Sequence, residues 1–95
     1  MTIDKNRVMA AIHTAGVITD EALERSAGLD KYRLRTAINS LAYDNMIERG
    51  RIEGSDADGW QLARRGRMWA ATPIGRAALE LPASDSKASK EEAAQ

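Results

Sequence analysis

Residues 19–49 read TDEALERSAGLDKYRLRTAINSLAYDNMIER, and they predict two helices joined by a tight turn. Gly28 can take the left-handed conformation in which a helix ends. Asp30 follows where the N-cap of the next helix belongs, because its carboxylate can accept hydrogen bonds from the free amides of the first turn. In such a pair the first helix braces the second. The face that the second helix presents therefore decides what this chain can bind.

The second helix, predicted over residues 31–44, has distinct inner and outer faces. Its inner face consists of apolar residues at the i, i+3, i+4, i+7 spacing of a buried helix side, namely Leu34, Ala37, Ile38 and Leu41. Its outer face and the flanks of that face carry Lys31, Tyr32, Arg33, Arg35, Thr36 and Asn39. Asn45 can end this helix in the left-handed conformation.

The residues before the pair predict a helix and a short strand. A first helix of about three turns, capped by either Asp4 or Thr2, ends at Gly16. The β-branched run at 17–19 favours one small strand. Its threonine then caps the first helix of the pair, predicted over residues 20–27.

Downstream of the pair the pattern changes to extended chain and turns. Residues 47–53 predict an edge strand with charges facing water, and residues 54–59, GSDADG, predict a turn or loop. The strand at 47–53 can pair with either of two later strand-like pieces, at 60–64 and 67–72, or with both. A three-stranded meander is the favoured arrangement.

The two later pieces flank Gly66, which predicts a hairpin. The tip of that hairpin would carry Arg64, Arg65 and Arg67. The residues expected to pack one face of the sheet against the helices are Trp60, Leu62, Met68 and Trp69.

The end of the chain predicts one short helix and a tail. Thr72 caps this helix, and Pro73 suits the first helical position, where its missing amide is not needed. Its expected apolar face consists of Ile74, Ala77, Ala78 and Leu81. Residues 83–95 lack large apolar side chains, which predicts a disordered tail after a single domain over residues 1–82.

Length and composition exclude several classes of protein. The 95 residues support one small domain. The chain has no cysteine and a single histidine, His13, which excludes disulfides, thiolate metal sites and histidine-rich metal sites. No apolar run approaches the roughly 18 residues of a membrane span, and the first residues lack the apolar core of a signal peptide. We therefore expect a soluble, cytoplasmic protein with no cofactor, metal, membrane or evident small-molecule ligand.

The charges are balanced overall but segregated along the chain. Lys+Arg and Asp+Glu both number 14, a neutrality that by itself argues against a strongly basic nucleic-acid binder. Residues 31–36 and 59–76 nevertheless contain basic residues and no acid, whereas acids gather in residues 20–24 and 53–58. Because salt screens exposed charges beyond about 10 Å, the local field of such basic patches decides contact with phosphate.

Two motifs in the right order carry a family resemblance. The segments SAGLDKYRLRTAINSLAYDNMIERGRI at 26–52 and ATPIGRAALEL at 71–81 resemble the winged helix-turn-helix domains of small bacterial transcriptional regulators. The resemblance covers about residues 4–81. It implies a mainly α fold with a small β-sheet (α+β), built from a three-helix core, a β wing and a short C-terminal helix. It also implies binding to double-stranded DNA.

The outer face of the predicted helix 31–44 has the chemistry to read DNA. Arginine reads guanine and asparagine reads adenine by paired hydrogen bonds in the major groove, and the Thr36 methyl group suits thymine. A merely solvated face would usually include acids, and none occurs between Asp30 and Asp44. The three arginines at 64–67 would hold the backbone or the minor groove. The predicted DNA-binding residues are Lys31, Tyr32, Arg33, Arg35, Thr36, Asn39, Arg64, Arg65 and Arg67.

A second class of function stays open. Nothing in the sequence resembles a catalytic site, so we do not expect an enzyme. The same fold could instead serve as a protein-interaction module that does not contact DNA. Because one small unit recognises DNA weakly, a homodimer on a palindromic site is expected, with the first and last helices as the surfaces left to form it.

Overall fold

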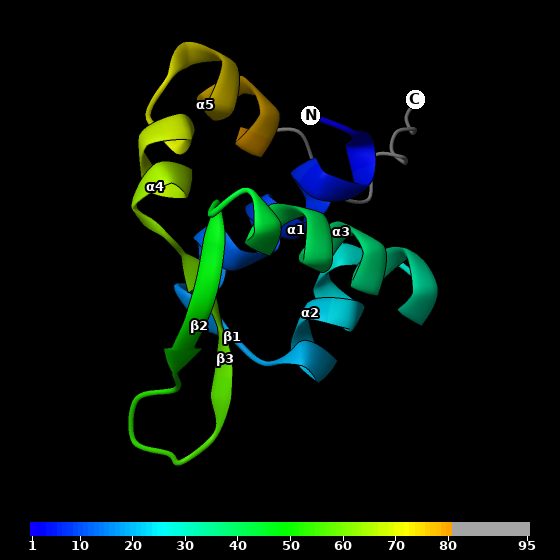
Figure 1. Ribbon diagram of the computed structural model, residues 1–95, viewed down its shortest axis with the longest axis vertical. Coiled ribbons are helices and arrows are strands. Elements are labelled where there is room, and N and C mark those ends of the chain that lie inside the picture. The colour runs from blue at the N-terminus through cyan, green and yellow to red at the C-terminus, as the bar shows by residue number, and fades with distance from the viewer. Residues whose placement is uncertain (81–95) are drawn as a thin grey trace, which may run out of the picture.

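The computed structural model describes residues 1–80, so the predicted tail at 83–95 lies outside the described residues. The elements, in chain order, are α1 (Ile3–Ala15), β1 (Val17–Ile18), α2 (Asp20–Ala27), α3 (Lys31–Tyr43), β2 (Ile47–Arg51), β3 (Asp58–Leu62), α4 (Arg64–Ala70) and α5 (Pro73–Glu80). Figure 1 shows α1, α2 and α3 gathered beside the β2–β3 hairpin, whose loop projects at the lower end. Helices α4 and α5 lie at the other end of the hairpin.

The helix pair forms as the sequence predicts, because its caps are local. The Thr19 hydroxyl accepts from the amide of Ala22 at 3.2 Å, and the Asp30 carboxylate accepts from the amide of Arg33 at 2.8 Å. Gly28 ends α2 in the left-handed region with a φ of 70°, and Asn45 takes a φ of 61° after α3. These two helix starts and stops are confirmed.

The core lies where α1, α2 and α3 meet. The inner face predicted for α3 is confirmed, since Leu34, Ala37, Ile38 and Leu41 are all buried. They join Val8, Met9 and Ile12 of α1, Leu23 and Ala27 of α2, Ile47 at the start of β2, and Met46 just before it. Each fully buried Leu, Ile or Met side chain stabilises the fold by roughly 2 kcal/mol. This packing sets which face of α3 remains outside.

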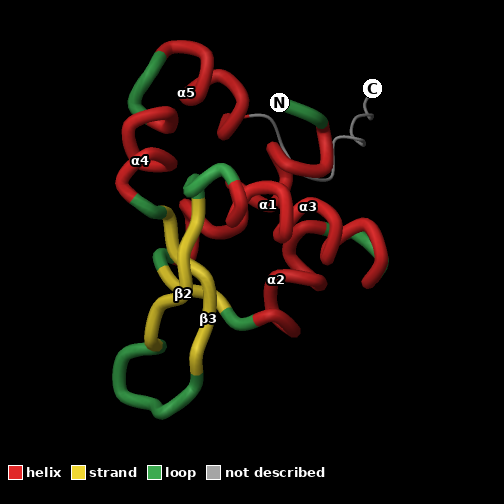
Figure 2. The backbone as a smooth tube through the Cα atoms, in the orientation of Figure 1, coloured by secondary structure: helices red, strands yellow, loops and turns green. Residues whose placement is uncertain are grey.

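The sheet is antiparallel with β3 in the centre, in the order β1-β3-β2 (Figure 2). Strand β2 pairs with β3 from Ile47↔Leu62 to Arg51↔Asp58, and β1 pairs with β3 through Val17↔Gln61 and Ile18↔Trp60. The short strand predicted at 17–19 is therefore confirmed. The predicted meander is right in pairing the strand at 47–53 with the piece at 60–64, but it is wrong in its third strand, which is β1 and not a segment after residue 62.

The predicted hairpin across Gly66 is also wrong, because Arg64–Ala70 forms α4. Gly66 is buried, and a Cβ at this position would collide with the carbonyl oxygen of Met46. The glycine therefore allows a helix to pack closely against the chain between α3 and β2, and it is not a turn residue. The amide of Ala63 donates to the same carbonyl at 3.0 Å. This contact requires two segments distant in sequence, so the local pattern could not reveal it.

Helix α5 begins as predicted but is rotated about its axis. The Thr72 hydroxyl accepts from the amide of Gly75 at 3.0 Å, which confirms the cap. The predicted apolar face is wrong in part, because Ile74 is 77% exposed and Ala77 is exposed. Gly75 is buried against the carbonyl of Trp69, where a Cβ would not fit, and this close contact sets the rotation. Leu81 lies outside the described residues.

Of the side chains predicted to pack one face of the sheet against the helices, some are half-buried and one is exposed. Trp60, Leu62 and Trp69 are half-buried against the core. Met68 is 62% exposed on the outer side of α4. Its predicted place in the core is wrong because the hairpin that would have held it there does not form.

Replacing Gly66 with alanine is expected to destabilise the domain by about 2 kcal/mol, because overpacking a close contact strains the backbone on both sides. Urea denaturation followed by tryptophan fluorescence measures the change. Met68→Ala on the exposed side of α4 is the matched control and should stay within about 0.5 kcal/mol of the wild type. Equal stability of Gly66→Ala and the control would contradict the contact with Met46.

Candidate nucleic-acid interface

One flank of α3, next to its buried face, lines a groove between α3, α2 and the hairpin. Lys31, Arg35 and Asn39 follow one another at i, i+4 and i+8, so they form a single stripe along the helix. All three are exposed and line the groove. Leu34 and Ile38 form the apolar part of the same wall. Three predicted site residues are thus brought together on one side of α3.

Tyr32 and Thr36 form a second exposed stripe beside the first. They are spaced i and i+4, and Tyr32 is 79% exposed. Tyr43, near the helix end, is 87% exposed. An exposed tyrosine offers an apolar ring and a hydroxyl that donates or accepts. This stripe widens the polar surface of α3 without adding an acid.

Arg33 lies on a different side of α3 from the groove stripe. Its guanidinium holds the carboxylate of Asp4 on α1, with Nη2–Oδ1 at 2.6 Å and Nε–Oδ2 at 3.1 Å. This hydrogen-bonded pair lowers the pKa of Asp4 below its ordinary 3.8 and raises the pKa of Arg33. A paired guanidinium has fewer donors left for another anion. The structure therefore gives Arg33 a role in joining α3 to α1.

The opposite side of the groove carries acids. Asp20, Glu21 and Glu24 of α2 line it together with Trp60 of β3. Carboxylates repel a phosphate backbone and cations attract it, so the two walls would act on such a ligand in opposite directions. The groove, with a volume of about 360 Å³, thus has one basic and one acidic wall.

A three-residue contact joins the hairpin to the start of α2. The Trp60 indole N–H donates to Asp20 Oδ1 at 2.8 Å. Arg49 of β2 lies over the Trp60 ring, 4.7 Å from its centroid, with Nη1 4.0 Å from the same Asp20 oxygen. Sequence reasoning missed this contact. The predicted meander pairs the two strands that carry Arg49 and Trp60, but no local pattern places the start of α2 beside them.

The loop of the β2–β3 hairpin is acidic, whereas the sequence predicts a hairpin tip that carries arginines. The loop at 52–57 contains the exposed acids Glu53 and Asp56, and Asp58 follows at the start of β3. The basic residues of the hairpin are Arg49 and Arg51 on β2, with Arg51 directly opposite Asp58. From the sequence alone both arginines are weaker candidates for binding DNA, because acids flank them.

The three arginines predicted at a wing tip lie elsewhere. Arg64, Arg65 and Arg67 belong to α4, at the end of the sheet away from the loop (Figure 1). Their predicted position on a hairpin tip is wrong, because Gly66 lies inside α4 and not in a turn. Arg64 and Arg65 are exposed, whereas Arg67 Nη1 donates to the carbonyl of Leu62 at 2.8 Å.

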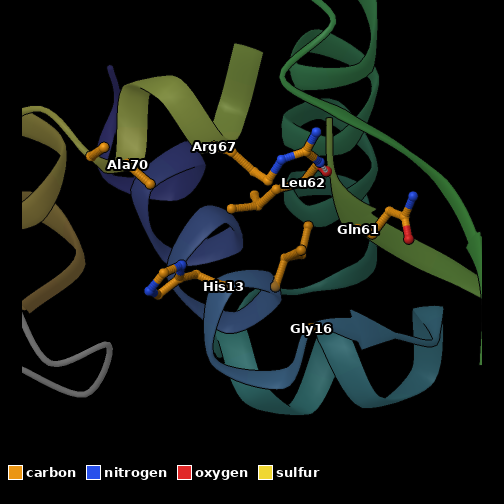
Figure 3. Close-up of a pocket in the computed structure, with 8 residues that line it drawn as sticks. His13, Gly16, Gln61, Leu62, Arg67 and Ala70 are labelled. Atoms are coloured by element: carbon orange, nitrogen blue, oxygen red, sulfur yellow. Dashed lines mark hydrogen bonds between the residues drawn. The ribbon is translucent and has the colours of Figure 1, made fainter. Parts of the chain in front are cut away.

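A second hollow, of about 490 Å³, lies between α1, β3 and α4 (Figure 3). Of the predicted site residues, only Arg67 lines it. Its other labelled neighbours in Figure 3 are His13, Gly16, Gln61, Leu62 and Ala70. Most of the lining is apolar or backbone, and the Arg67 guanidinium already points to Leu62.

Comparison with known proteins supports the architecture. No family model matches the chain, and no curated protein matches it by sequence. The structure is similar to the solved structure of a MarR-family transcriptional regulator from Silicibacter pomeroyi, with a TM-score of 0.56 and 20% identity. The match covers 83% of this chain and 47% of that chain, so this chain spans about half the length of the regulator. At this identity the likeness shows the fold, a winged helix-turn-helix, which confirms the predicted fold class.

Residues 1–80 also bear on two other kinds of site. None of the helices in this range is both long enough and apolar enough to cross a membrane. Within the same range, no three His, Cys, Asp or Glu side chains are grouped so that they could hold a metal ion.

Replacing Asp4 with asparagine is expected to lower the melting temperature at neutral pH, because Arg33 then has no charged partner. Since folding lowers the pKa of Asp4 below 3.8, the pair stabilises the fold above that pH and ceases to do so as pH falls through the folded pKa. Thermal melts of wild type and variant should therefore converge in acid. Asp56→Asn, in the exposed loop, is the control. A gap between wild type and Asp4→Asn that is unchanged below pH 3.8 would contradict this role.

Proposed function

We propose that this protein binds double-stranded DNA as a transcriptional regulator, with α3 in the major groove. The observation that carries the proposal is the exposed stripe of Lys31, Arg35 and Asn39 on the side of α3 that faces the groove. The fold supports it, because a winged helix presents such a helix on a braced support. The similar solved structure is described as a transcriptional regulator.

The residues of the stripe differ in the part of DNA that each can bind. Lys31, in the first turn, is placed for a phosphate, since an ammonium acts as a point charge. Arg35 and Asn39 can each make two hydrogen bonds to a base edge, to guanine and adenine respectively. Thr36 and Tyr32 add contacts to a thymine methyl group and to the backbone. Arg33 contributes indirectly, because its pairing with Asp4 holds α3 in place.

The hairpin contributes through its strand and not its tip. Arg49 and Arg51 alternate with Glu48 and Gly50, so they share the sheet face on which Ile47 is buried. The contact of Arg49 with Asp20 shows that this face turns toward α2. We therefore propose that both arginines contact phosphates that flank the groove. The acidic loop is expected to stay away from the backbone.

We also propose that two copies act together on a palindromic site. Specific binding by one unit of this size is weak, and a two-fold symmetric pair reads two half-sites. The exposed apolar side chains Ile3 on α1 and Ile74 on α5, which are 70% and 77% exposed, lie on the two helices that the sequence predicts as dimer surfaces.

The acidic wall of the groove favours the alternative function, in which the fold binds another protein and not DNA. Asp20, Glu21 and Glu24 would suit a basic protein surface better than a phosphate backbone. Binding to a duplex separates the two functions. A DNA-binding protein releases counterions, so its affinity falls linearly with salt on logarithmic axes. A module that binds only proteins should show no such affinity for DNA.

Replacing Lys31 and Arg35 together with alanine is expected to weaken binding to a labelled duplex of random sequence about tenfold or more at low salt. The slope of log affinity against log salt should become shallower by about 0.9 for each phosphate that the variant no longer binds. Fluorescence anisotropy between about 50 and 200 mM salt measures both quantities, and the same titrations give the number of copies bound. Arg25→Ala, on the last turn of α2, is the matched control. If the wild type does not bind the duplex at any salt concentration, the protein-interaction function is favoured instead.

A second variant tests the arginines of α4. We propose that Arg64 and Arg65 contact the backbone outside the α3 groove, because both are exposed and no acid lies between residues 59 and 79. Arg64→Ala with Arg65→Ala is expected to lower duplex affinity severalfold and to reduce the salt slope, while base preference is unchanged. An unchanged slope would remove both arginines from the DNA-binding surface.

A further inference from the structure

Asp20 is an acid in the candidate interface that lies beside Arg49, a basic residue of the β2–β3 hairpin. The carboxylate oxygen Oδ1 accepts from the Trp60 indole N–H at 2.8 Å and lies 4.0 Å from Arg49 Nη1. Arg49 also lies over the Trp60 ring at 4.7 Å. Asp20 and Trp60 both line the groove beside the α3 stripe. The contact therefore sits at the surface that a duplex would approach.

Three features fix the position of this carboxylate. Asp20 is the first residue of α2, directly after the Thr19 cap. A carboxylate in the first helical turn is favoured by the partial positive charge of the helix start. The Trp60 hydrogen bond then sets the direction of the side chain. Asp20 is consequently held in place even when Arg49 leaves it.

The ion pair between Asp20 and Arg49 is weak, so Arg49 can leave Asp20 for another anion. The Arg49 side chain is 52% exposed and the Asp20 side chain is 61% exposed, and exposed ion pairs are weak because water screens them. A phosphate is a stronger partner for a guanidinium, which it can bind through two parallel hydrogen bonds. A duplex entering the groove would thus compete with Asp20 for Arg49.

We propose that Asp20 is an affinity-setting positioning residue, which holds Arg49 on the Trp60 ring in the free protein and yields it to a DNA phosphate on binding. Two effects oppose binding in this arrangement. Arg49 must leave Asp20, and the uncovered carboxylate then faces the backbone. The inference rests on the proposed DNA-binding function and adds that DNA affinity is held below what the basic residues alone would provide.

Asp20→Asn separates the charge of this residue from its hydrogen bond. The asparagine Oδ1 can still accept from the Trp60 indole, whereas the variant neither attracts Arg49 nor repels phosphate. Duplex affinity is expected to rise about three- to tenfold at low salt, and the gain should shrink as salt screens the charges. Glu21→Gln is the matched control. It neutralises the next carboxylate on the same groove wall, and its gain should be smaller.

A double-mutant cycle with Arg49→Ala distinguishes the hold on Arg49 from simple charge repulsion. If Asp20 holds Arg49, the gain from Asp20→Asn should be at least threefold larger in the wild type than in Arg49→Ala. Glu21→Gln should give the same gain in both backgrounds.

Each outcome of these titrations has one meaning. Equal gains from Asp20→Asn in both backgrounds, or no gain at all, would overturn the inference. If binding still depends on Lys31 and Arg35 in that case, the proposed function stands without it. If none of the variants binds the duplex, the proposed function fails and the inference fails with it.

Discussion

The fold depends on the packing of the inner face of α3 against α1. Leu34, Ile38 and Leu41 are buried with Met9 and Ile12, and the Asp4–Arg33 pair joins the N-terminal turns of the same two helices. Because this packing permits one rotation of α3, it also decides which residues remain outside. The i, i+4, i+8 spacing of Lys31, Arg35 and Asn39 makes them a stripe, and this rotation leaves that stripe exposed on the groove side. The packing of the core therefore determines which side chains of α3 form the candidate interface.

Close contacts made by glycine place the other elements around that core. A side chain at Gly66 or Gly75 would collide with a backbone carbonyl, of Met46 and Trp69 respectively. These contacts direct α4 and α5 to the end of the sheet opposite the loop, and they carry Arg64 and Arg65 away from the hairpin. The hairpin is consequently left with Arg49 and Arg51 as its basic residues.

The charge distribution explains how a neutral chain can still present a basic surface. The α3 stripe is basic, the facing wall of α2 is acidic, and the Asp20–Trp60–Arg49 contact joins that wall to the hairpin. Opposite charges on two walls of one groove give weak net attraction for a phosphate backbone but a defined direction of approach.

The sequence by itself determined the features that depend on residues close together in the chain. Caps at Thr19 and Asp30, stops at Gly28 and Asn45, and the spacing of the α3 core residues act within one or two turns, so the helix pair and its outer face could be predicted. The tertiary structure decided what depends on contact between distant segments. Gly66 resembles a turn residue in the sequence but packs against Met46 in the fold. The partner of Arg33, Asp4, lies on another helix and is not indicated by the residues around Arg33. The partner of Arg49 likewise required β2, β3 and α2 to meet, because a strand pairing and a helix start determine it jointly.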